Sequence, residues 1–413
     1  MIKKAIQFIE ELRPHTSNIF WSNLNQAVMT VFALVTSVAF ARSGGEFGKE
    51  LYGQYLFVLG MFGLFGVVSI PGLRAVIFRT TSQGYEGVYR RATTFSFLWS
   101  LIGIPLLVTA GILIYLFKTR ILGISLIAVA LFFPFEISLK NWVLFLKGRS
   151  DFRKLAFYNS IKFLITLIAV TASIVFTKNI IIILIAYFMV NSGFNILYHL
   201  KTVSSLKNDE VDEGWKRQGY ALTILDLSTV IFGRVDIVLI GALLPFGELA
   251  IYGLVMKLVG VFLEGIRSTI EAVGPNLFQS KKITIGYFYK FFLLLFLVPI
   301  ILYPIIKYPV LFLYGGGFSE VIGFSQLYIF IIPFYFLNVI ATYFMIKYKL
   351  NREINISRIA SMIAVVVLYA TLIPLYGILG GVISSMLYFV IQLAMNLFLL
   401  QTRKAKNIDG QEI

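Results

Sequence analysis

The sequence predicts an all-α membrane protein in which twelve transmembrane helices form two lobes of six. Three observations predict this fold. Apolar residues make up 58% of the 413 residues and charged residues only 14%, a composition typical of a polytopic membrane protein. The apolar residues fall into stretches of about 20 residues, long enough to cross a bilayer as helices. Lysine and arginine gather in alternate loops between those stretches, which is the usual loop asymmetry of membrane proteins.

The apolar stretches define twelve candidate spans in chain order. Each can cross ~30 Å of hydrocarbon, because a helix rises 1.5 Å per residue. They lie at residues 20–42, 52–73, 93–117, 121–146, 155–177, 179–200, 219–243, 248–275, 285–306, 322–346, 354–375 and 377–400.

The longest polar segment on the inner side separates the first six spans from the last six. Its charged sequence, with Asp209, Glu210, Asp212 and Glu213, is typical of a solvated loop. We therefore expect four parts. They are an N-lobe at residues 1–200, a cytoplasmic linker at 201–218, a C-lobe at 219–400 and a cytoplasmic tail at 401–413.

The distribution of positive charge predicts the orientation. Loops on the side of the N-terminus contain 23 lysines and arginines, and loops on the other side contain 6. By the positive-inside rule both termini are cytoplasmic, in a multi-pass protein of the cytoplasmic membrane. The net charge of +16 therefore indicates orientation, and we expect no nucleic-acid partner. The N-terminal segment lacks an apolar core before a small-residue cleavage site, so we expect no cleaved signal peptide.

Two short patterns recur at an offset of about 200 residues. The segment Phe47–Gly53 pairs Phe-Gly with Tyr-Gly, and Phe246–Gly253 repeats this with one extra residue. Phe145–Ser150 recurs in kind as Met345–Leu350. A repeat of six spans keeps the same orientation, so the two halves would be related by an axis along the membrane normal. The substrate path would then lie between them.

The eighth span is the most informative stretch. It carries Lys257, Glu264, Arg267 and Glu271 in an otherwise apolar helix. At 100° per residue these four positions fall within roughly 80° of arc on one face. A charge near the bilayer centre costs at least ~2.5–3.5 kcal/mol, so such residues normally face a bundle interior or a water-filled cavity.

The seventh span carries Asp226, Arg234 and Asp236. If spans 7 and 8 form an antiparallel hairpin, Asp236 lies level with Lys257 and Asp226 lies level with Arg267. We therefore predict two ion pairs. One interpretation is that the pairs serve to hold the hairpin together. The other is that they line a substrate cavity, and the two interpretations are compatible.

The first half carries fewer charges within its spans. Arg74 lies at the inner end of span 2, either as an interfacial positive residue or as a substrate contact. Pro71 and the following glycine are expected to bend that span. Glu136 and Lys140 are spaced to pair on one helix face. Lys162 is near enough to the end of its span to extend toward the interface.

Several kinds of chemistry have no support in the sequence. There is no cysteine, so a disulfide or a thiol-ligated metal is excluded. No P-loop and no zinc-binding histidine pattern occurs. We therefore expect a protein that is not an enzyme, with no cofactor and no metal.

The two six-span halves, the cytoplasmic termini and the Phe-Gly/Tyr-Gly phrase resemble the polysaccharide flippases of the O-antigen type. These belong to the multidrug, oligosaccharidyl-lipid and polysaccharide exporter superfamily. The resemblance covers the whole chain. It implies a V-shaped pair of lobes around a central cavity, alternating between inward-open and outward-open states. It also implies a lipid-linked oligosaccharide with a phosphate or pyrophosphate as the substrate.

A narrower resemblance involves the related lipid II flippases, whose span 8 begins with an Ala-Asp-Arg-Leu-like motif. Val255–Leu258 stands in that place here, with Lys257 for the arginine and Met256 for the aspartate. The Arg-Asp pair of their span 1 is missing, which argues against lipid II as the substrate. Asp236 resembles the acidic residue of their sodium site, but spans 11 and 12 contain no carboxylate to complete it.

These observations lead to three functional hypotheses. The first is a flippase that moves lipid-linked oligosaccharide repeat units, with Lys257, Arg267 and Arg234 balancing the phosphate charge. Glu264 and Glu271 would bind sugar hydroxyls, and a sodium or proton gradient would drive the cycle. The second is a cation-coupled multidrug exporter of the same fold. The third is a membrane enzyme, either a polysaccharide polymerase or a polyprenyl-dependent glycosyltransferase, and the short outer loops disfavour it. Expected partners are membrane lipids, the polymerase and glycosyltransferases.

Overall fold

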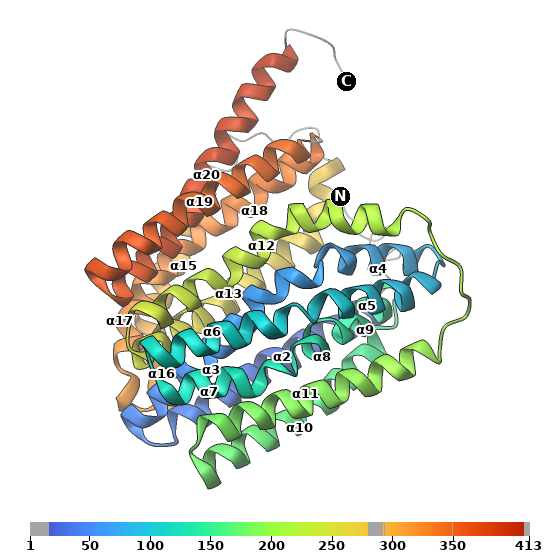
Figure 1. The fold of residues 1–413 in the computed structure, drawn as a ribbon. Coiled ribbons are helices and arrows are strands. Elements are labelled where there is room, and N and C mark those ends of the chain that lie inside the picture. Colours follow the sequence, from blue (N-terminus) through green and yellow to red (C-terminus); the bar gives the residue numbers. More distant parts are fainter. Residues whose placement is uncertain (1–15, 280–291, 293, 349, 409–413) are drawn as a thin grey trace. The chain divides into compact units, whose positions relative to one another are not determined.

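The structure is a computed structural model that describes residues 16–279, 292, 294–348 and 350–408. Over these residues the chain forms α-helices, short 3-10 helices and connecting turns, and no strand. This confirms the all-α fold. Figure 1 shows the long helices and the short breaks within them. Helical hydrogen bonding satisfies the backbone within each segment, which is a requirement of a lipid environment.

The chain divides into two compact units. The first comprises residues 1–43 and 58–231, and the second comprises residues 44–57 and 232–413. Two helices continue from one unit into the other, α3 (Gly45–Phe65) and α12 (Trp215–Leu243). The lobe and linker boundaries expected from the sequence stay a prediction.

The first unit consists of α-helices and short 3-10 helices, several of which begin at or next to a glycine or a proline. Its elements are α2 (Thr16–Ala41), η2 (Gly66–Ser69), α4 (Gly72–Ser82), α5 (Gly87–Ser100), α6 (Gly103–Phe117), α7 (Arg120–Ala130), α8 (Phe133–Ile137), η3 (Leu139–Asn141), α9 (Trp142–Gly148), α10 (Phe152–Thr177) and α11 (Ile180–Val203). One core cluster of this unit is centred on Tyr89, Trp142 and Phe145, which are fully buried.

The second unit contains the charged eighth span and the C-terminal helix pair. Its elements are α13 (Phe246–Gln279), α15 (Leu297–Ile305), α16 (Lys307–Tyr314), η4 (Gly316–Phe318), α17 (Glu320–Tyr328), η5 (Ile329–Ile331), α18 (Ile332–Lys347), α19 (Asn351–Tyr376) and α20 (Ile378–Ile408). Helices α19 and α20 lie side by side (Figure 1). The buried residues Ile340, Met345 and Leu393 belong to a core cluster here.

Ten of the described helices are long and apolar enough to cross a membrane, and a bent pair brings the number to eleven. These correspond to the predicted spans except the seventh. That span is the 29-residue helix α12, which carries Asp226, Arg234 and Asp236. The ninth predicted span lies partly outside the described residues, and α15 and α16 together form its apolar helix at Leu297–Tyr314. A multi-pass membrane protein is therefore shown.

The bend expected in span 2 is present. Helix α3 and its 3-10 extension end at Ser69, and Ile70 adopts a left-handed conformation with φ of 57°. Such a backbone is costly for a β-branched residue. Pro71 follows and α4 begins at Gly72. The span therefore ends earlier than the predicted residue 73, and Arg74 lies in a separate helix.

The fourth span is broken in the middle, which the sequence analysis did not predict. The segments Arg120–Ala130 and Phe133–Gly148 meet at 67°. Pro134 lies at the start of the second segment, where its missing backbone donor is tolerated. The break directs Glu136 into the interior of the first unit, where it is 8% exposed.

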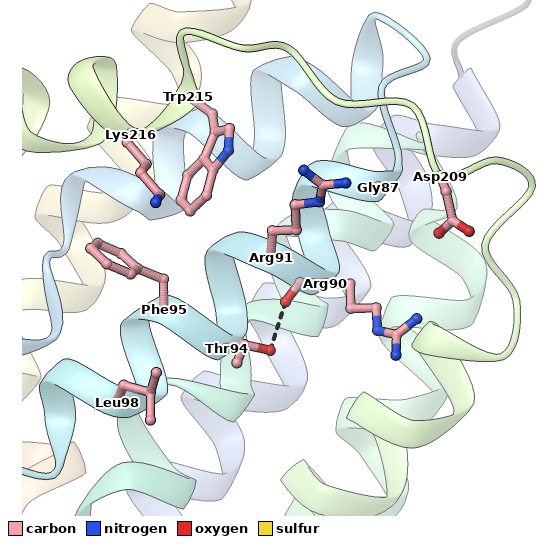
Figure 2. A pocket seen from close by; sticks show the side chains of 9 residues that line it. All are labelled: Gly87, Arg90, Arg91, Thr94, Phe95, Leu98, Asp209, Trp215 and Lys216. Atoms are coloured by element: carbon pink, nitrogen blue, oxygen red, sulfur yellow. Dashed lines mark hydrogen bonds between the residues drawn. The ribbon is translucent and has the colours of Figure 1, made fainter.

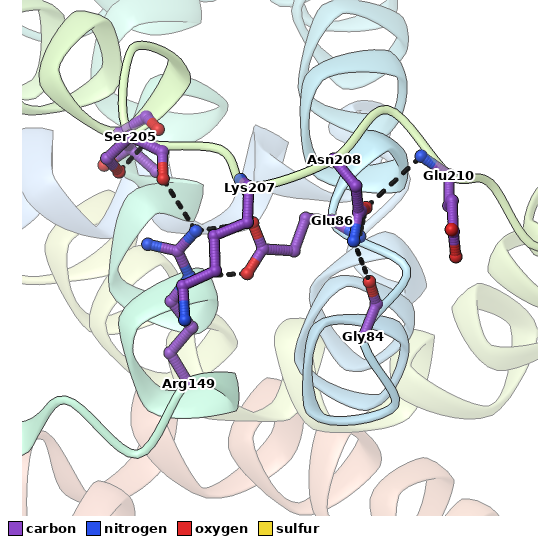
Figure 3. Close-up of polar contacts among 8 residues, drawn as sticks. Gly84, Glu86, Arg149, Ser205, Lys207, Asn208 and Glu210 are labelled. Atoms are coloured by element: carbon purple, nitrogen blue, oxygen red, sulfur yellow. Dashed lines mark hydrogen bonds and ion pairs between the residues drawn. The ribbon is translucent and has the colours of Figure 1, made fainter.

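The segment after α11 is held against the first unit, although it was expected to be a solvated loop. The guanidinium of Arg149 donates to Glu86 Oε1 at 2.7 Å and to the backbone oxygen of Ser205 at 2.7 Å (Figure 3). The backbone N–H of Lys207 donates to Glu86 Oε2 at 2.6 Å. Asn208 accepts from the backbone N–H of Glu86 at 3.2 Å. One buried carboxylate thereby organises the start of the segment.

The expectation of solvated carboxylates is wrong for Asp212. Its Oδ2 lies 2.6 Å from a guanidinium nitrogen of Arg79, and its Oδ1 accepts from the backbone N–H of Gly214 at 3.2 Å. Asp212, one of the four carboxylates, therefore attaches this segment to α4 through Arg79. Asp209, Glu210 and Glu213 are exposed.

Candidate functional site

The repeated Tyr-Gly phrases meet at a crossing of α3 and α13 in the second unit. A Cβ on Gly53 would lie 1.7 Å from the backbone oxygen of Phe246, and one on Gly253 would lie 2.4 Å from Leu56 Cδ1. Small residues let helix backbones approach this closely. The ring of Phe57 packs edge-on against Phe246 at 5.6 Å. This contact fixes the start of α13 and hence the position of its charged residues.

Lys257 lies one turn beyond that crossing. Its Nζ donates to the hydroxyl of Tyr52 at 2.9 Å and lies 5.4 Å from the centre of the same ring. Tyr52 is 1% exposed. The ammonium is therefore held by the tyrosine of the first Tyr-Gly phrase, which contributes both a hydrogen bond and a cation–π contact.

The predicted charged face of α13 continues beyond Lys257. Glu264 and Arg267 are exposed, and Lys257 is half-buried. Glu271 lies on the same helix, but its side chain is outside the described residues. Two cations and one carboxylate therefore lie on one face of α13 between residues 257 and 267.

The predicted ion pair between Asp236 and Lys257 is not present among the ion pairs of the described residues. Lys257 bonds to Tyr52, and Asp236 Oδ2 accepts a hydrogen bond from the hydroxyl of Tyr252 at 2.8 Å. The hairpin register predicts which residues lie at the same height in two neighbouring helices. It does not predict the direction in which each side chain points around its helix axis. Here Lys257 and Asp236 each form a hydrogen bond with a tyrosine hydroxyl. The second predicted pair involves Asp226, whose side chain is outside the described residues.

Asp236 ends a chain of buried hydroxyl groups. The hydroxyl of Tyr252 lies 2.8 Å from Ser385 Oγ, which lies 2.8 Å from the hydroxyl of Tyr369. Ser385 Oγ also donates to the backbone oxygen of Gly381 at 3.0 Å. The three hydroxyl-bearing residues are at most 5% exposed. Helices α12, α13, α19 and α20 thus meet at one carboxylate.

The second oxygen of Asp236 is unusual. Oδ1 is inaccessible to solvent and has no hydrogen-bond partner in the described part of the chain. An unpartnered buried carboxylate oxygen is costly unless the group takes up a proton or a cation. With a single carboxylate and several hydroxyl donors, this arrangement suits a proton better than a metal ion. No group of three acidic, histidine or cysteine residues that could hold a metal occurs among the described residues.

The remaining predicted site residues are distributed between the units. Arg234 is exposed on α12 in the second unit. Arg74 is half-buried on α4 and belongs to the first unit. Lys257, Glu264 and Arg267 therefore lie on one helix, α13, whereas Arg74 lies on a helix of the other unit.

A second buried polar network lies in the first unit. Lys162 is 1% exposed, and its Nζ donates to Asn195 Oδ1 at 3.0 Å. Asn195 Nδ2 donates to Glu136 Oε2 at 3.0 Å, and Glu136 Oε1 lies 3.8 Å from Lys140. The expected pair of Glu136 and Lys140 is therefore confirmed. The expectation that Lys162 extends to the interface is wrong, because Asn195 accepts its hydrogen bond inside the helix bundle.

Sequence reasoning did not identify these tyrosines as partners of the charged residues. Tyr52 and Tyr252 were identified only as parts of a repeat, and Tyr369 was not considered. The signal that could have found the first two was their similar spacing from a Phe-Gly pair, since Tyr52 follows Phe47 by five residues and Tyr252 follows Phe246 by six. Tyr369 and Ser385 have no such signal, because their proximity depends on how α19 packs on α20.

Comparison with known proteins gives matches in structure only. No protein-family model and no curated protein matches the sequence. An inward-facing multidrug resistance MATE family transporter of the MOP superfamily matches with a TM-score of 0.71, at 10% identity over 93% of this chain and 99% of that chain. The chain has the fold of a MOP-superfamily transporter.

Two further solved structures agree with this fold. Lipid II flippase MurJ in an inward closed conformation matches with a TM-score of 0.68, at 15% identity over 93% of this chain and 87% of that chain. The eukaryotic MATE transporter AtDTX14 matches with a TM-score of 0.57, at 12% identity over 96% of this chain and 99% of that chain. At these identities the likeness concerns the fold, which both a flippase and multidrug transporters share.

Proposed function

We propose that the protein is a flippase that moves a lipid-linked oligosaccharide, carried on a polyprenyl phosphate or pyrophosphate, across the cytoplasmic membrane for surface polysaccharide synthesis. The observation that carries the proposal is the pair of cations on the charged face of α13. Lys257 and Arg267 lie on one face of a membrane helix, and Lys257 is supported by Tyr52. A charged head group cannot cross ~30 Å of hydrocarbon unaided, and fixed cations at membrane depth would balance its negative charge.

The neighbouring groups suit the rest of such a substrate. Glu264 is exposed one turn before Arg267 and can accept hydrogen bonds from sugar hydroxyls. Arg234 on α12 and Arg74 on α4 are further candidates for the phosphate, and Glu271 for the sugar. The lipid tail would stay in the bilayer. Cytoplasmic termini would place the loading step on the side where lipid-linked sugars are made.

Asp236 is proposed as the coupling group. Protonation would neutralise its buried carboxylate and remove the cost of the unpartnered Oδ1. Deprotonation would strengthen the bond from Tyr252, because hydrogen bonds to charged acceptors are stronger than neutral ones. The protonation state would thus change how α12 is held against α13 and α20. A proton gradient can drive a transport cycle only through such a contact, whose strength depends on protonation.

A reconstituted flipping assay tests the proposal. We expect Lys257→Met and Arg267→Met each to lower the rate of flipping of a fluorescent polyprenyl-pyrophosphate oligosaccharide by roughly tenfold or more, since one charge-assisted contact contributes about 1.5–3 kcal/mol. Lys307→Met, at the start of α16, is the matched control and should retain wild-type flipping. Wild-type rates in both α13 variants would rule out these residues as the phosphate site.

The alternative function is multidrug export. Asp236 and Glu264 are the acidic groups that would favour a cationic drug in place of a phosphate. Vesicles loaded with a cationic dye distinguish the two. The exporter function would be supported if the wild-type protein exports the dye, Glu264→Gln abolishes this export, and no flipping of the lipid-linked sugar is detected.

A further inference from the structure

A basic pocket of about 640 Å³ lies in the first unit. Arg90 and Arg91 come from the first turn of α5, and Trp215 and Lys216 come from the start of α12 (Figure 2). Phe95 lies one turn below the arginines. Three cations therefore line a pocket that has one acidic lining residue, Asp209.

The cations of this pocket are available to a ligand. Arg90 and Arg91 are exposed, and within the described residues they form no ion pair and no side-chain hydrogen bond. Lys216 Nζ lies over two rings, 5.4 Å from the centre of Phe95 and 5.6 Å from that of Trp215. The excess of positive charge is thus not neutralised by the protein itself.

The walls of the pocket are preformed. Trp215 is 6% exposed and packs edge-on against Phe95 at 5.7 Å. On the other side, Gly87 lets the backbone of Asp209 approach, because a Cβ there would lie 2.4 Å from the Asp209 oxygen. The ion pair of Arg79 with Asp212 holds the same segment. A ligand would therefore meet fixed groups, which lowers the ordering cost of binding.

An apolar strip continues from the cations down the membrane span of α5. Leu98 is 58% exposed, Leu101 41% and Ile102 45%, and the span runs from Gly87 to Phe117. Leu98 also lines the pocket. The site thus combines phosphate-binding cations at the loop end with exposed hydrocarbon below them. A water-soluble phosphate would use only the first of these features.

We propose that this pocket binds the phosphate head group of an anionic membrane phospholipid, whose acyl chains lie along the strip of Leu98 and Ile102. Basic pockets beside membrane helices commonly recognise anionic lipid head groups. The pocket lies on the side that the distribution of lysine and arginine predicts to be cytoplasmic, where anionic lipids are frequent. The lipid is a regulator or structural ligand of the first unit, distinct from the substrate of α13.

Lipid retention measured by native mass spectrometry tests this proposal. The full chain is purified from nanodiscs that contain equal amounts of phosphatidylglycerol and phosphatidylcholine. We expect the protein to retain phosphatidylglycerol roughly tenfold over phosphatidylcholine. The variant Arg90→Gln/Arg91→Gln/Lys216→Gln should lose this preference, and Arg90→Lys/Arg91→Lys should keep it. The control Lys147→Gln/Lys201→Gln/Arg352→Gln removes the same charge elsewhere and should also keep it.

Two further arms separate the lipid from other sources of phosphate. Leu98→Gln/Ile102→Gln leaves the cations intact and should weaken lipid retention several-fold, which marks the acyl-chain contact. Millimolar glycerol 1-phosphate should not displace the lipid. Displacement by glycerol 1-phosphate, or unchanged phosphatidylglycerol retention in the triple glutamine variant, would overturn the proposal. The substituted side chains are exposed or line the pocket, except that of Lys147, which is half-buried, and thermal unfolding of each variant verifies folding.

Discussion

At the scale of single residues, two charged groups of the second unit are hydrogen-bonded to tyrosine hydroxyls. Lys257 bonds to Tyr52, and Asp236 bonds to Tyr252. A hydrogen bond to a charged group contributes about 1.5–3 kcal/mol, so a phenol partly replaces an opposite charge without neutralising it. In the proposed cycle the further partner is phosphate for Lys257 and a proton for Asp236.

The coupling role of Asp236 gives a prediction at this scale. Asp236→Asn keeps the shape and the hydrogen bond to Tyr252 but cannot exchange a proton. Flipping in proteoliposomes should then lose its stimulation by an imposed pH gradient and fall to the rate without a gradient. Glu320→Gln, an exposed acid at the start of α17, should keep the stimulation. A full response to the gradient in Asp236→Asn would show that coupling occurs elsewhere.

At the scale of elements, two devices position the helices. One is the close crossing of α3 and α13 at the two Tyr-Gly phrases. The other is the clamp of Glu86 and Arg149, which holds the segment between α11 and α12. The clamp lies outside the membrane spans, so its carboxylate can follow the pH of the solvent.

The crossing can be tested by adding one methyl group. Gly53→Ala would place a Cβ 1.7 Å from the oxygen of Phe246, so α3 and α13 must separate. Overpacking of this kind costs about 1–3 kcal/mol or more, and thermal unfolding in detergent should show a clearly lower midpoint. Gly260→Ala is the control, since its Cβ would meet nothing within 4 Å and alanine favours a helix. Equal stability of the two variants would contradict the close crossing.

The clamp predicts a dependence on acid. Burial alone would raise the pKa of Glu86, but the hydrogen bonds from Arg149 and from the backbone of Lys207 outweigh it, and the pKa lies below its ordinary value. The carboxylate therefore stabilises the fold above that ordinary value, near 4.3, and this contribution is lost as the pH falls through the lower folded-state pKa.

Glu86→Gln should accordingly lower the free energy of unfolding by about 1–3 kcal/mol at neutral pH. The difference from the wild-type chain should shrink as the pH falls below roughly 4. Unfolding of both proteins from pH 7 to pH 3 measures it. Glu210→Gln, on the same segment and exposed, should match the wild-type chain throughout. A difference between Glu86→Gln and wild type that stays constant with pH would show that the charge of Glu86 is not the cause.

At the scale of the whole molecule, the sequence predicts the membrane spans well because every backbone polar group in lipid must be bonded within its own helix. Apolar length alone then locates the spans. The bend at Pro71 could also be predicted, since proline has a local effect. The break before Pro134, the bond from Lys162 to Asn195 and the chain from Asp236 to Tyr369 could not be predicted. They depend on which helices pack together and on rotation about each helix axis.

The proposed transport requires that water and substrate reach the charged face of α13. The chain has no cysteine, so a single introduced thiol reports on its own position. Glu264→Cys should react with a charged, membrane-impermeant thiol reagent at least ~10-fold faster than Val367→Cys, because the thiolate forms only where water reaches it. Val367 is 56% exposed on the membrane span of α19. Added substrate should slow the reaction of Glu264→Cys. A Glu264→Cys thiol as unreactive as that of Val367→Cys would contradict a water-accessible transport site on α13.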